Sequence, residues 1–80
     1  MIIKPITTEK VIRMLELDNV LVFEVGFKDK KDEIKTEVEK VFKVNVIKVN
    51  TLTRKNKKIA YVTLDKKNPA IDVATKLGMI

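Results

Sequence analysis

Two β-branched segments joined by a short polar turn constrain the fold of this 80-residue chain more than any other feature. Apolar and polar residues alternate over Val44–Lys55, and a second strand-like run, Ile59–Leu64, follows the polar turn Lys55–Lys58. Alternation with a period of two is typical of a strand with one buried face. A phase slip between Val46 and Ile47 predicts a bulge or bend. The pattern therefore predicts an antiparallel hairpin in the second half of the chain.

Beyond the phase slip, the side chains of the first hairpin strand divide between two faces of the predicted sheet. One face is expected to carry Ile47, Val49, Thr51 and Thr53, and the other Lys48, Asn50, Leu52 and Arg54.

The rest of the chain predicts three helices and two further strands. Apolar spacing indicates helices, and alternation or β-branched content indicates strands. The expected elements are an extended lead over Ile2–Pro5, a helix over Glu9–Leu17 capped by Thr7 or Thr8, a strand over Val20–Phe27, a helix over Asp32–Phe42 and a helix over Ala70–Leu77 that ends at Gly78.

Three details of this pattern can be checked. The strand Val20–Phe27 is apolar on both faces, so both faces are expected to be partly covered. The helix Asp32–Phe42 is expected to pack through a stripe of Ile34, Val38, Val41 and Phe42 and to carry a Lys35–Glu39 pair on its outer face. Ile71, Val73, Ala74 and Leu77 are expected to pack the last helix.

The order of elements is strand, helix, strand, helix, strand, strand, helix. This order predicts an α+β fold, with a small antiparallel sheet of about four strands and flanking helices. A length of 80 residues allows one domain, and we expect residues 1–80 to form it.

The positive charge is confined to one stretch, Lys43–Lys67. It holds eight lysine and arginine residues against Asp65 alone, so its charge of +7 exceeds the +6 of the whole chain. A localised charge of this kind is typical of a surface that binds a polyanion. Because the stretch coincides with the predicted hairpin, we expect the hairpin to bind RNA.

The composition argues against an enzyme. Cysteine, histidine and serine are absent, which removes thiolate and imidazole metal ligands and the common nucleophile–base pairs. The two glycines do not form a phosphate-binding loop. We expect no catalytic residue, metal, cofactor or small-molecule substrate. The N-terminal segment has no long apolar run, so we expect a soluble, cytoplasmic protein without a membrane partner.

The candidate RNA contacts lie on the hairpin. Arginine and lysine neutralise phosphates, while amide and hydroxyl groups can bind ribose hydroxyls or base edges. The residues are Arg54, Lys55, Lys57 and Lys58 for phosphates, and Asn50 and Thr51 for hydrogen bonds. Tyr61 is either a base-stacking residue or, as we favour, a strand tyrosine half-buried under a helix with its hydroxyl at the rim.

Three classes of function fit unequally. Binding to structured RNA through phosphates and shape fits best, because an aromatic stacking platform and a basic recognition helix are both absent. A stand-alone nucleic-acid or chromatin binder would use the same basic hairpin. A small phosphatase-like enzyme would need a phosphate-cradling loop with an arginine, and neither Arg13 nor Arg54 has that setting.

Four segments in series resemble a known family. "PITTEK" (Pro5–Lys10), "EIKTEVEKVFKVNVIKVNT" (Glu33–Thr51) and "AYVTL" (Ala60–Leu64) resemble the universal large-subunit ribosomal protein family twenty-three. The tail "IDVATKLGMI" (Ile71–Ile80) is similar to its archaeal and eukaryotic branch. The resemblance implies a four-stranded antiparallel sheet flanked by helices, in a structural protein that binds large-subunit rRNA beside the exit of the nascent-peptide tunnel.

The resemblance also implies site residues and partners. The implied rRNA contacts are Lys35, Lys48, Asn50, Thr51, Arg54 and the pair Lys57–Lys58. The family's "T/S-E-K" motif falls on Thr8, Glu9 and Lys10, which implies a docking site for the signal recognition particle or other nascent-chain factors. Neighbouring ribosomal proteins at the tunnel exit are further implied partners.

The chain departs from the family pattern at three places. The bacterial hairpin extension into the tunnel is replaced here by the short turn Lys55–Lys58. The usual threonine cap before the second helix is Lys30, with Asp29 as the expected substitute. The family's "K-K-A" triplet is one residue longer, since Ile59 separates Lys58 from Ala60.

Overall fold

Four antiparallel strands form one sheet in the order β1-β2-β4-β3 in the computed structural model, which describes residues 4–6 and 8–76. The elements in chain order are β1 (Lys4–Pro5), α1 (Glu9–Asp18), β2 (Val20–Val25), α2 (Lys31–Phe42), β3 (Val46–Arg54), β4 (Lys57–Leu64) and α3 (Ala70–Lys76). The predicted α+β fold and its order of elements are confirmed. No helix in the described ranges is long and apolar enough to cross a membrane.

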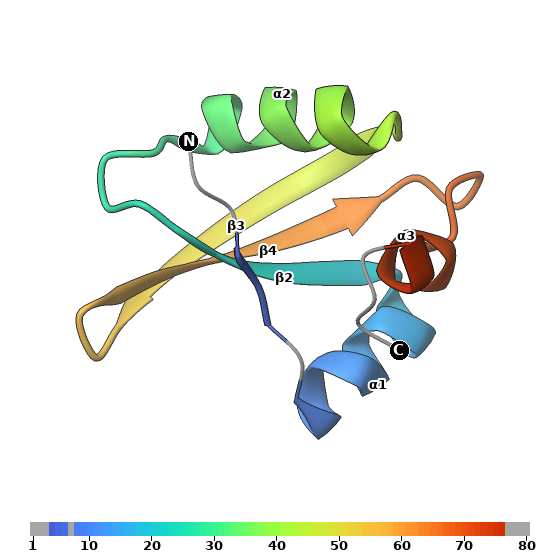
Figure 1. The fold of residues 1–80 in the computed structure, drawn as a ribbon, viewed down its shortest axis with the longest axis horizontal. Coiled ribbons are helices and arrows are strands. Elements are labelled where there is room, and N and C mark those ends of the chain that lie inside the picture. The colour runs from blue at the N-terminus through green and yellow to red at the C-terminus, as the bar shows by residue number, and fades with distance from the viewer. Residues whose placement is uncertain (1–3, 7, 77–80) are drawn as a thin grey trace.

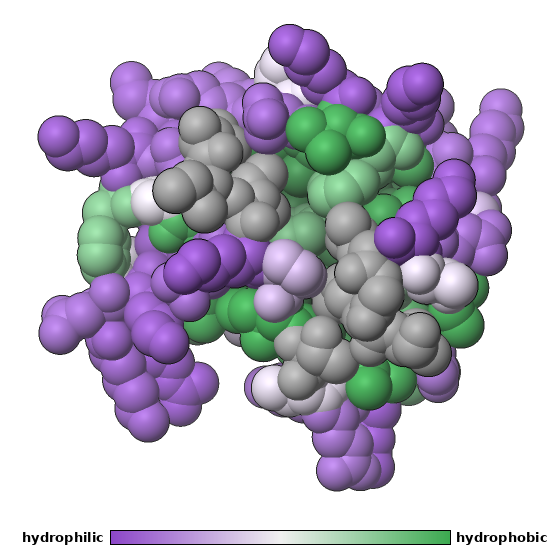
Figure 2. Space-filling model, viewed as in Figure 1, coloured by the Kyte–Doolittle hydropathy of each residue, from purple (hydrophilic) through white to green (hydrophobic). Residues whose placement is uncertain are grey.

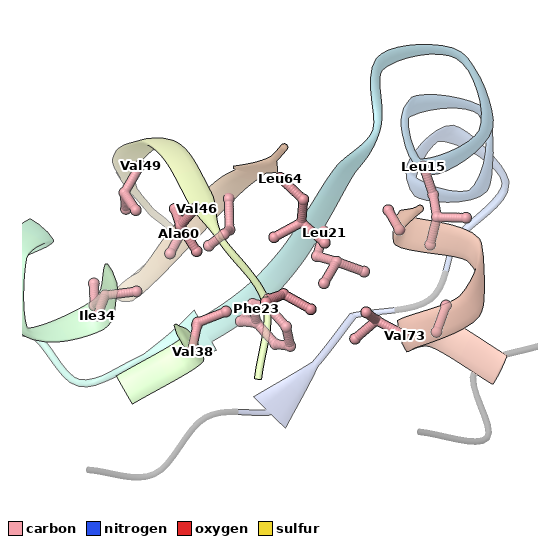
Figure 3. Packing of buried hydrophobic residues seen from close by; sticks show 14 of the residues in the cluster. Leu15, Leu21, Phe23, Ile34, Val38, Val46, Val49, Ala60, Leu64 and Val73 are labelled. Atoms are coloured by element: carbon pink, nitrogen blue, oxygen red, sulfur yellow. The ribbon is translucent and has the colours of Figure 1, made fainter. Parts of the chain in front are cut away.

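The helices cover one face of the sheet more fully than the other. Figure 1 shows α2 running along one side of the sheet close to β3, while α1 and α3 gather at the end where β2 begins. The main core lies under α2 and α3, and Figure 3 shows Phe23 of β2 between Val38 of α2 and Val73 of α3. The Phe23 ring stacks on Phe42 at a centroid distance of 5.8 Å and an interplanar angle of 10°. This stack anchors the C-terminal end of α2 to the sheet.

Strand β2 is apolar on both faces and is covered on both. Leu21, Phe23 and Val25 belong to the main core. Val20 and Val22 point to the other side and form a second cluster with Val11 of α1, together with half-buried residues of β4. The prediction of two covered faces is therefore confirmed. Two-sided burial explains why this strand has no clean alternation of apolar and polar residues.

Helix α1 begins where the sequence predicted. The hydroxyl oxygen of Thr8 accepts a hydrogen bond from the Val11 amide at 3.2 Å, which caps the helix. Thr7, Leu77, Gly78 and the first residues of the expected lead lie outside the described residues.

Other predicted boundaries and contacts differ. Strand β2 ends at Val25, because Gly26 begins a turn. Lys30 precedes α2 without a side-chain cap, and the Asp29 carboxylate accepts the Gly26 amide at 2.8 Å instead of capping the helix. Val41 is 54% exposed, because Phe42, the next residue around the helix, makes the contact with the core. The predicted stripe is wrong at that position.

Within the described ranges, two further expectations are corrected and a third is confirmed. Lys35 and Glu39 form no ion pair there; the Glu39 carboxylate accepts the Val46 amide at 3.2 Å and so ties α2 to the start of β3. Ile71 is 42% exposed, whereas Val73 and Ala74 are buried as expected. The bulge is confirmed, because Val46 pairs with Leu64 and Lys48 with Thr63, which leaves Ile47 as the extra residue.

Asn19 joins four elements through hydrogen bonds that the sequence did not reveal. It follows α1 in the left-handed conformation, with φ of 57°. Its side-chain oxygen accepts the first amide of α3, that of Ala70, at 2.6 Å. Its side-chain nitrogen contacts the carbonyl oxygens of Leu64 and Asp65, each at 3.1 Å, and that of Asn68 at 3.3 Å. One side chain thus fixes the end of β4 and the start of α3 beside β2.

We expect Asn19→Ala to lower the free energy of unfolding by about 2–4 kcal/mol, because it leaves part-buried carbonyl and amide groups unpaired and places alanine at a positive φ. Asn19→Gly, which removes only the side-chain bonds, should cost less. Urea unfolding measures both changes. The matched control is Asn50→Ala on an exposed strand position. Equal stability of Asn19→Ala and this control would contradict the assigned role.

Candidate nucleic-acid interface

The strand register divides the side chains of β3 and β4 between two faces. Residues that pair across antiparallel strands point to the same side of the sheet. Val49 pairs with Val62, and both are buried under α2. The opposite side of the sheet therefore carries the side chains of the four pairs that alternate with these, namely Lys48–Thr63, Asn50–Tyr61, Leu52–Ile59 and Arg54–Lys57. We call these eight side chains the open face.

The open face has little cover. Four of its residues from Lys48 to Arg54 are exposed, as is Lys57, while Ile59, Tyr61 and Thr63 are half-buried. Ile59 and Tyr61 lean against the cluster of Val11, Val20 and Val22, which covers the face only near β2. The outer part is therefore a twisted two-stranded surface that carries three cations.

The hairpin turn is shorter than the sequence predicted. Lys57 and Lys58 belong to β4, so only Lys55 and Asn56 form the turn. Both have positive φ, 49° and 62°, as a type I′ turn requires. This turn matches the right-handed twist of the strands and keeps Arg54 directly opposite Lys57. Figure 2 shows hydrophilic side chains gathered at this end of the molecule, around the place where Figure 1 draws the turn.

The open face unites five of the nine predicted RNA contacts, namely Lys48, Asn50, Arg54, Lys57 and Tyr61. Lys55 lies at the turn beside them. Thr51 and Lys58 point to the α2 side of the sheet, and Lys35 lies exposed on α2. The alternation of the strand separates these last three residues from the open face.

Two open-face residues, Lys57 and Tyr61, make contacts with other parts of the chain. The Lys57 ammonium lies 3.8 Å from a carboxylate oxygen of Glu24 on β2, a partner that sequence reasoning missed. Tyr61 is half-buried and packs against the α1 cluster, which agrees with the favoured interpretation of a strand tyrosine under a helix. Thr63, which extends the open face beyond Tyr61, was also missed, because only the register reveals it.

Lys58 makes contacts within the chain. Its ammonium donates to the carbonyl oxygen of Phe27 at 3.4 Å and also to that of Asp29. An ammonium has three N–H donors, so one remains for a phosphate. Lys58 therefore ties the β2–α2 loop to the hairpin in addition to any contact outside the chain.

The predicted docking residues Thr8, Glu9 and Lys10 lie together at the exposed start of α1. The Glu9 side chain is 85% exposed and lies 3.3 Å from the Arg13 guanidinium one turn along the helix. Helix α1 lies near the end of the sheet opposite the hairpin turn (Figure 1), so this surface is separate from the Arg54–Lys57 end of the open face.

A shallow, open depression on α2 is lined by Asp32, Glu33, Thr36 and Glu37. Within the described ranges, no cluster of three or more acidic, histidine or cysteine residues is arranged to hold a metal ion.

Comparison with known proteins gives the family. The model of the family "Ribosomal protein L23" matches residues 1–73. The chain belongs to this family. The resemblance read from the sequence segments is thereby confirmed.

Two relatives in the family show how far the likeness extends. "Large ribosomal subunit protein uL23" of Saccharomyces cerevisiae is 44% identical over 78 residues, which is 96% of this chain and 55% of the relative. "Large ribosomal subunit protein uL23B" of Schizosaccharomyces pombe is 41% identical over 80 residues, 99% of this chain and 57% of the relative. The chain thus spans a little over half the length of these relatives. Both names denote proteins of the large ribosomal subunit.

The turn offers a test of the hairpin geometry in this family member. We expect the double substitution Lys55→Asn and Asn56→Gly to raise the free energy of unfolding by about 1 kcal/mol, because both residues are better suited to positive φ than the originals. Thermal unfolding measures the gain. Lys55→Ala, which removes the same charge without favouring the left-handed conformation, is the control. A double variant no more stable than Lys55→Ala would contradict the type I′ turn.

Proposed function

We propose that the chain is a structural constituent of the large ribosomal subunit that binds large-subunit rRNA through the open face and the hairpin turn. The single observation that carries this proposal is the coincidence of two independent features. The chain belongs to a ribosomal protein family, and Lys48, Arg54 and Lys57 of its basic stretch lie on a sheet face that the described helices cover only near β2. The protein would act on the ribosome in the cytoplasm.

Electrostatics supports RNA as the ligand of the open face. Lys48, Arg54 and Lys57 point to the same side of the hairpin, with Lys55 at its end. Glu24 neutralises part of the charge of Lys57, but no acidic residue lies on β3 or β4. Each phosphate contact releases counterions, so affinity grows with the number of cations that reach the backbone.

Hydrogen-bonding groups on the same face support recognition of RNA. Asn50 and Tyr61 are cross-strand partners at its centre, and Thr63 continues the row. An amide and hydroxyl groups can bind ribose 2′-hydroxyls, which distinguish RNA from DNA. The half-buried Tyr61 would offer its polar end rather than a fully exposed ring. Thr51, Lys58 and Lys35, on the α2 side of the sheet, would contact a second rRNA segment.

The start of α1 is proposed as the factor-docking surface, beside the tunnel exit and neighbouring ribosomal proteins. Thr8 holds the helix start, while Glu9 and Lys10 project into solvent and are free to meet the signal recognition particle or another nascent-chain factor. The separation of this surface from the hairpin turn would allow rRNA and a factor to bind together.

The proposed rRNA contacts predict how binding depends on salt. Replacing Lys48, Arg54 and Lys57 by alanine should weaken binding to large-subunit rRNA and lower the slope of log affinity against log salt by about two to three units, roughly one per lost phosphate contact. Filter binding at several salt concentrations measures the slope. The control variant replaces Lys40, Lys66 and Lys76, which removes the same charge from exposed positions off the open face. Equal effects of the two triple variants would contradict the assignment.

The proposed function also predicts assembly of the chain into the large ribosomal subunit. The tagged chain, expressed in its own cells, should sediment with the large subunit at one copy per particle through a sucrose gradient that contains moderate salt. The triple variant of the open face should move to the top of the gradient. Recovery of the wild-type chain with duplex DNA instead would support the alternative, a general nucleic-acid binder.

A substitution at Glu9 tests whether the rRNA-binding surface and the factor-docking surface are separate. Glu9→Lys should weaken binding of the signal recognition particle to large subunits at least several-fold, because it reverses an exposed charge, and should leave rRNA binding unchanged. Co-sedimentation of the particle with subunits measures the first effect, and filter binding the second. The control Glu16→Lys makes the same reversal at another exposed position of α1. Loss of rRNA binding by Glu9→Lys alone would contradict two separate surfaces.

A further inference from the structure

The loop between β2 and α2 forms a tight turn with a fixed shape. The Asp29 amide donates to the Gly26 carbonyl at 3.1 Å, and the Asp29 carboxylate accepts the Gly26 amide at 2.8 Å. These reciprocal bonds place Phe27 and Lys28 at the two central positions of the turn. A Cβ atom at Gly26 would lie 3.0 Å from an Asp29 carboxylate oxygen, so any other residue at this position would require the Asp29 side chain to shift by a few tenths of an ångström.

The same loop is fastened to the hairpin. The Lys58 ammonium donates to the carbonyl oxygens of Phe27 and Asp29, and Lys58 pairs directly with Val25 at the end of β2. The turn that carries Phe27 therefore lies beside the Lys57–Lys58 end of β4, close to the hairpin turn. A loop already held by four hydrogen bonds loses little conformational entropy when its central side chains bind a ligand.

The Phe27 side chain belongs to neither hydrophobic cluster. Its side chain is 59% exposed, while Phe23 is fully buried, Phe42 packs against the core and Tyr61 leans on the α1 cluster. Among the four aromatic residues of the chain, Phe27 alone presents a largely free ring. Its neighbours Lys28 and Lys30 are exposed cations, and the only acidic group in the turn, Asp29, is occupied by the Gly26 amide.

We propose that the Phe27–Lys28 turn is a second RNA-binding element, in which an unpaired base stacks on the Phe27 ring while Lys28 contacts the adjoining phosphate. A rigid aromatic ring flanked by cations has the chemistry that binds single-stranded nucleotides. Lys58 acts as a positioning residue that holds the turn. The inference rests on the proposed rRNA binding and adds to it a loop that takes a single-stranded nucleotide.

Substitutions at position 27 test the stacking. With large-subunit rRNA from the chain's own organism as the probe, Phe27→Ala should bind about 5- to 100-fold more weakly, as expected for loss of one base–aromatic stack. Phe27→Tyr should bind like the wild type, and Phe27→Leu should bind like Phe27→Ala. The salt slope should stay unchanged in all three variants, because no charge is altered.

A fluorescence measurement detects the base itself. The chain has no tryptophan, so Phe27→Trp introduces the only indole. Stacking of a base should quench its emission when rRNA binds. Inorganic polyphosphate, which carries the charge without bases, should compete for the protein and leave the emission high. Quenching by polyphosphate to the same degree would overturn the stacking role.

The control is Leu17→Ala, which truncates an apolar side chain that is 82% exposed. Leu17 lies on α1, which precedes β2, whereas the Phe27 turn follows β2. It should leave rRNA binding unchanged. Wild-type affinity in Phe27→Ala, while the wild-type chain binds rRNA with normal salt dependence, would overturn this inference alone. Failure of the wild-type chain to bind rRNA would overturn the proposed function and this inference together. Loss of association with a neighbouring ribosomal protein, with rRNA affinity unchanged, would assign Phe27 to a protein contact instead.

Discussion

Burial of β2 on both faces is the constraint on which the rest of the structure depends. Phe23 and its neighbours face α2 and α3, and Val20 and Val22 face α1, so this strand needs cover on two sides. Among the described residues, α1 packs on one face of β2, and α2 and α3 pack on the other. None of these three helices covers the outer side of β3 and β4. The open face is thus a consequence of where the apolar residues of β2 lie, and it carries Lys48, Arg54 and Lys57.

An uncovered sheet face must be soluble by itself, and the hairpin meets this need with charge. Lysine and arginine at alternating positions keep a surface strand hydrated and discourage pairing with other strands. On the open face, Lys48 lies at one end and the cross-strand pair Arg54–Lys57 at the other, so the strands fix the positions of cations that could meet a polyanion. Solubility of the free chain and the proposed affinity for RNA would therefore use the same side chains. The hydrophobic cluster of Ile59 and Tyr61 with α1 fixes the twist of this surface without covering it.

The sequence predicted the fold well, because its main elements follow from local periodicity. The alternation around the Val46–Lys48 slip located the bulge, and the apolar content of β2 indicated two-sided burial. Contacts between residues distant in the chain escaped prediction. Asn19 lies between a predicted helix and a predicted strand, and nothing in the local sequence indicates its bonds to residues more than 40 positions away. Five of the nine predicted RNA-contact residues share the open face, but a turn two residues shorter than predicted placed Lys57 and Lys58 in β4, on opposite faces. Phe27 was read as the last residue of a strand, because Gly26 and Asp29 gave no local sign of the turn they close.

Backbone conformation shows how charge and stability compete in the basic stretch. Four non-glycine residues within the described ranges have positive φ, and two of them, Lys43 and Lys55, are lysines. Lysine has no side-chain group that favours the left-handed conformation, which asparagine and glycine adopt more readily. At the end of α2 and at the hairpin turn, the chain therefore gives up backbone stability that glycine would supply and gains a cation at each place. The loss of backbone stability is offset only if the charge binds a ligand, and a polyanion that approaches the hairpin turn would bind Lys55. The strained turn would then act with the open face beside it as one surface in the proposed binding of RNA.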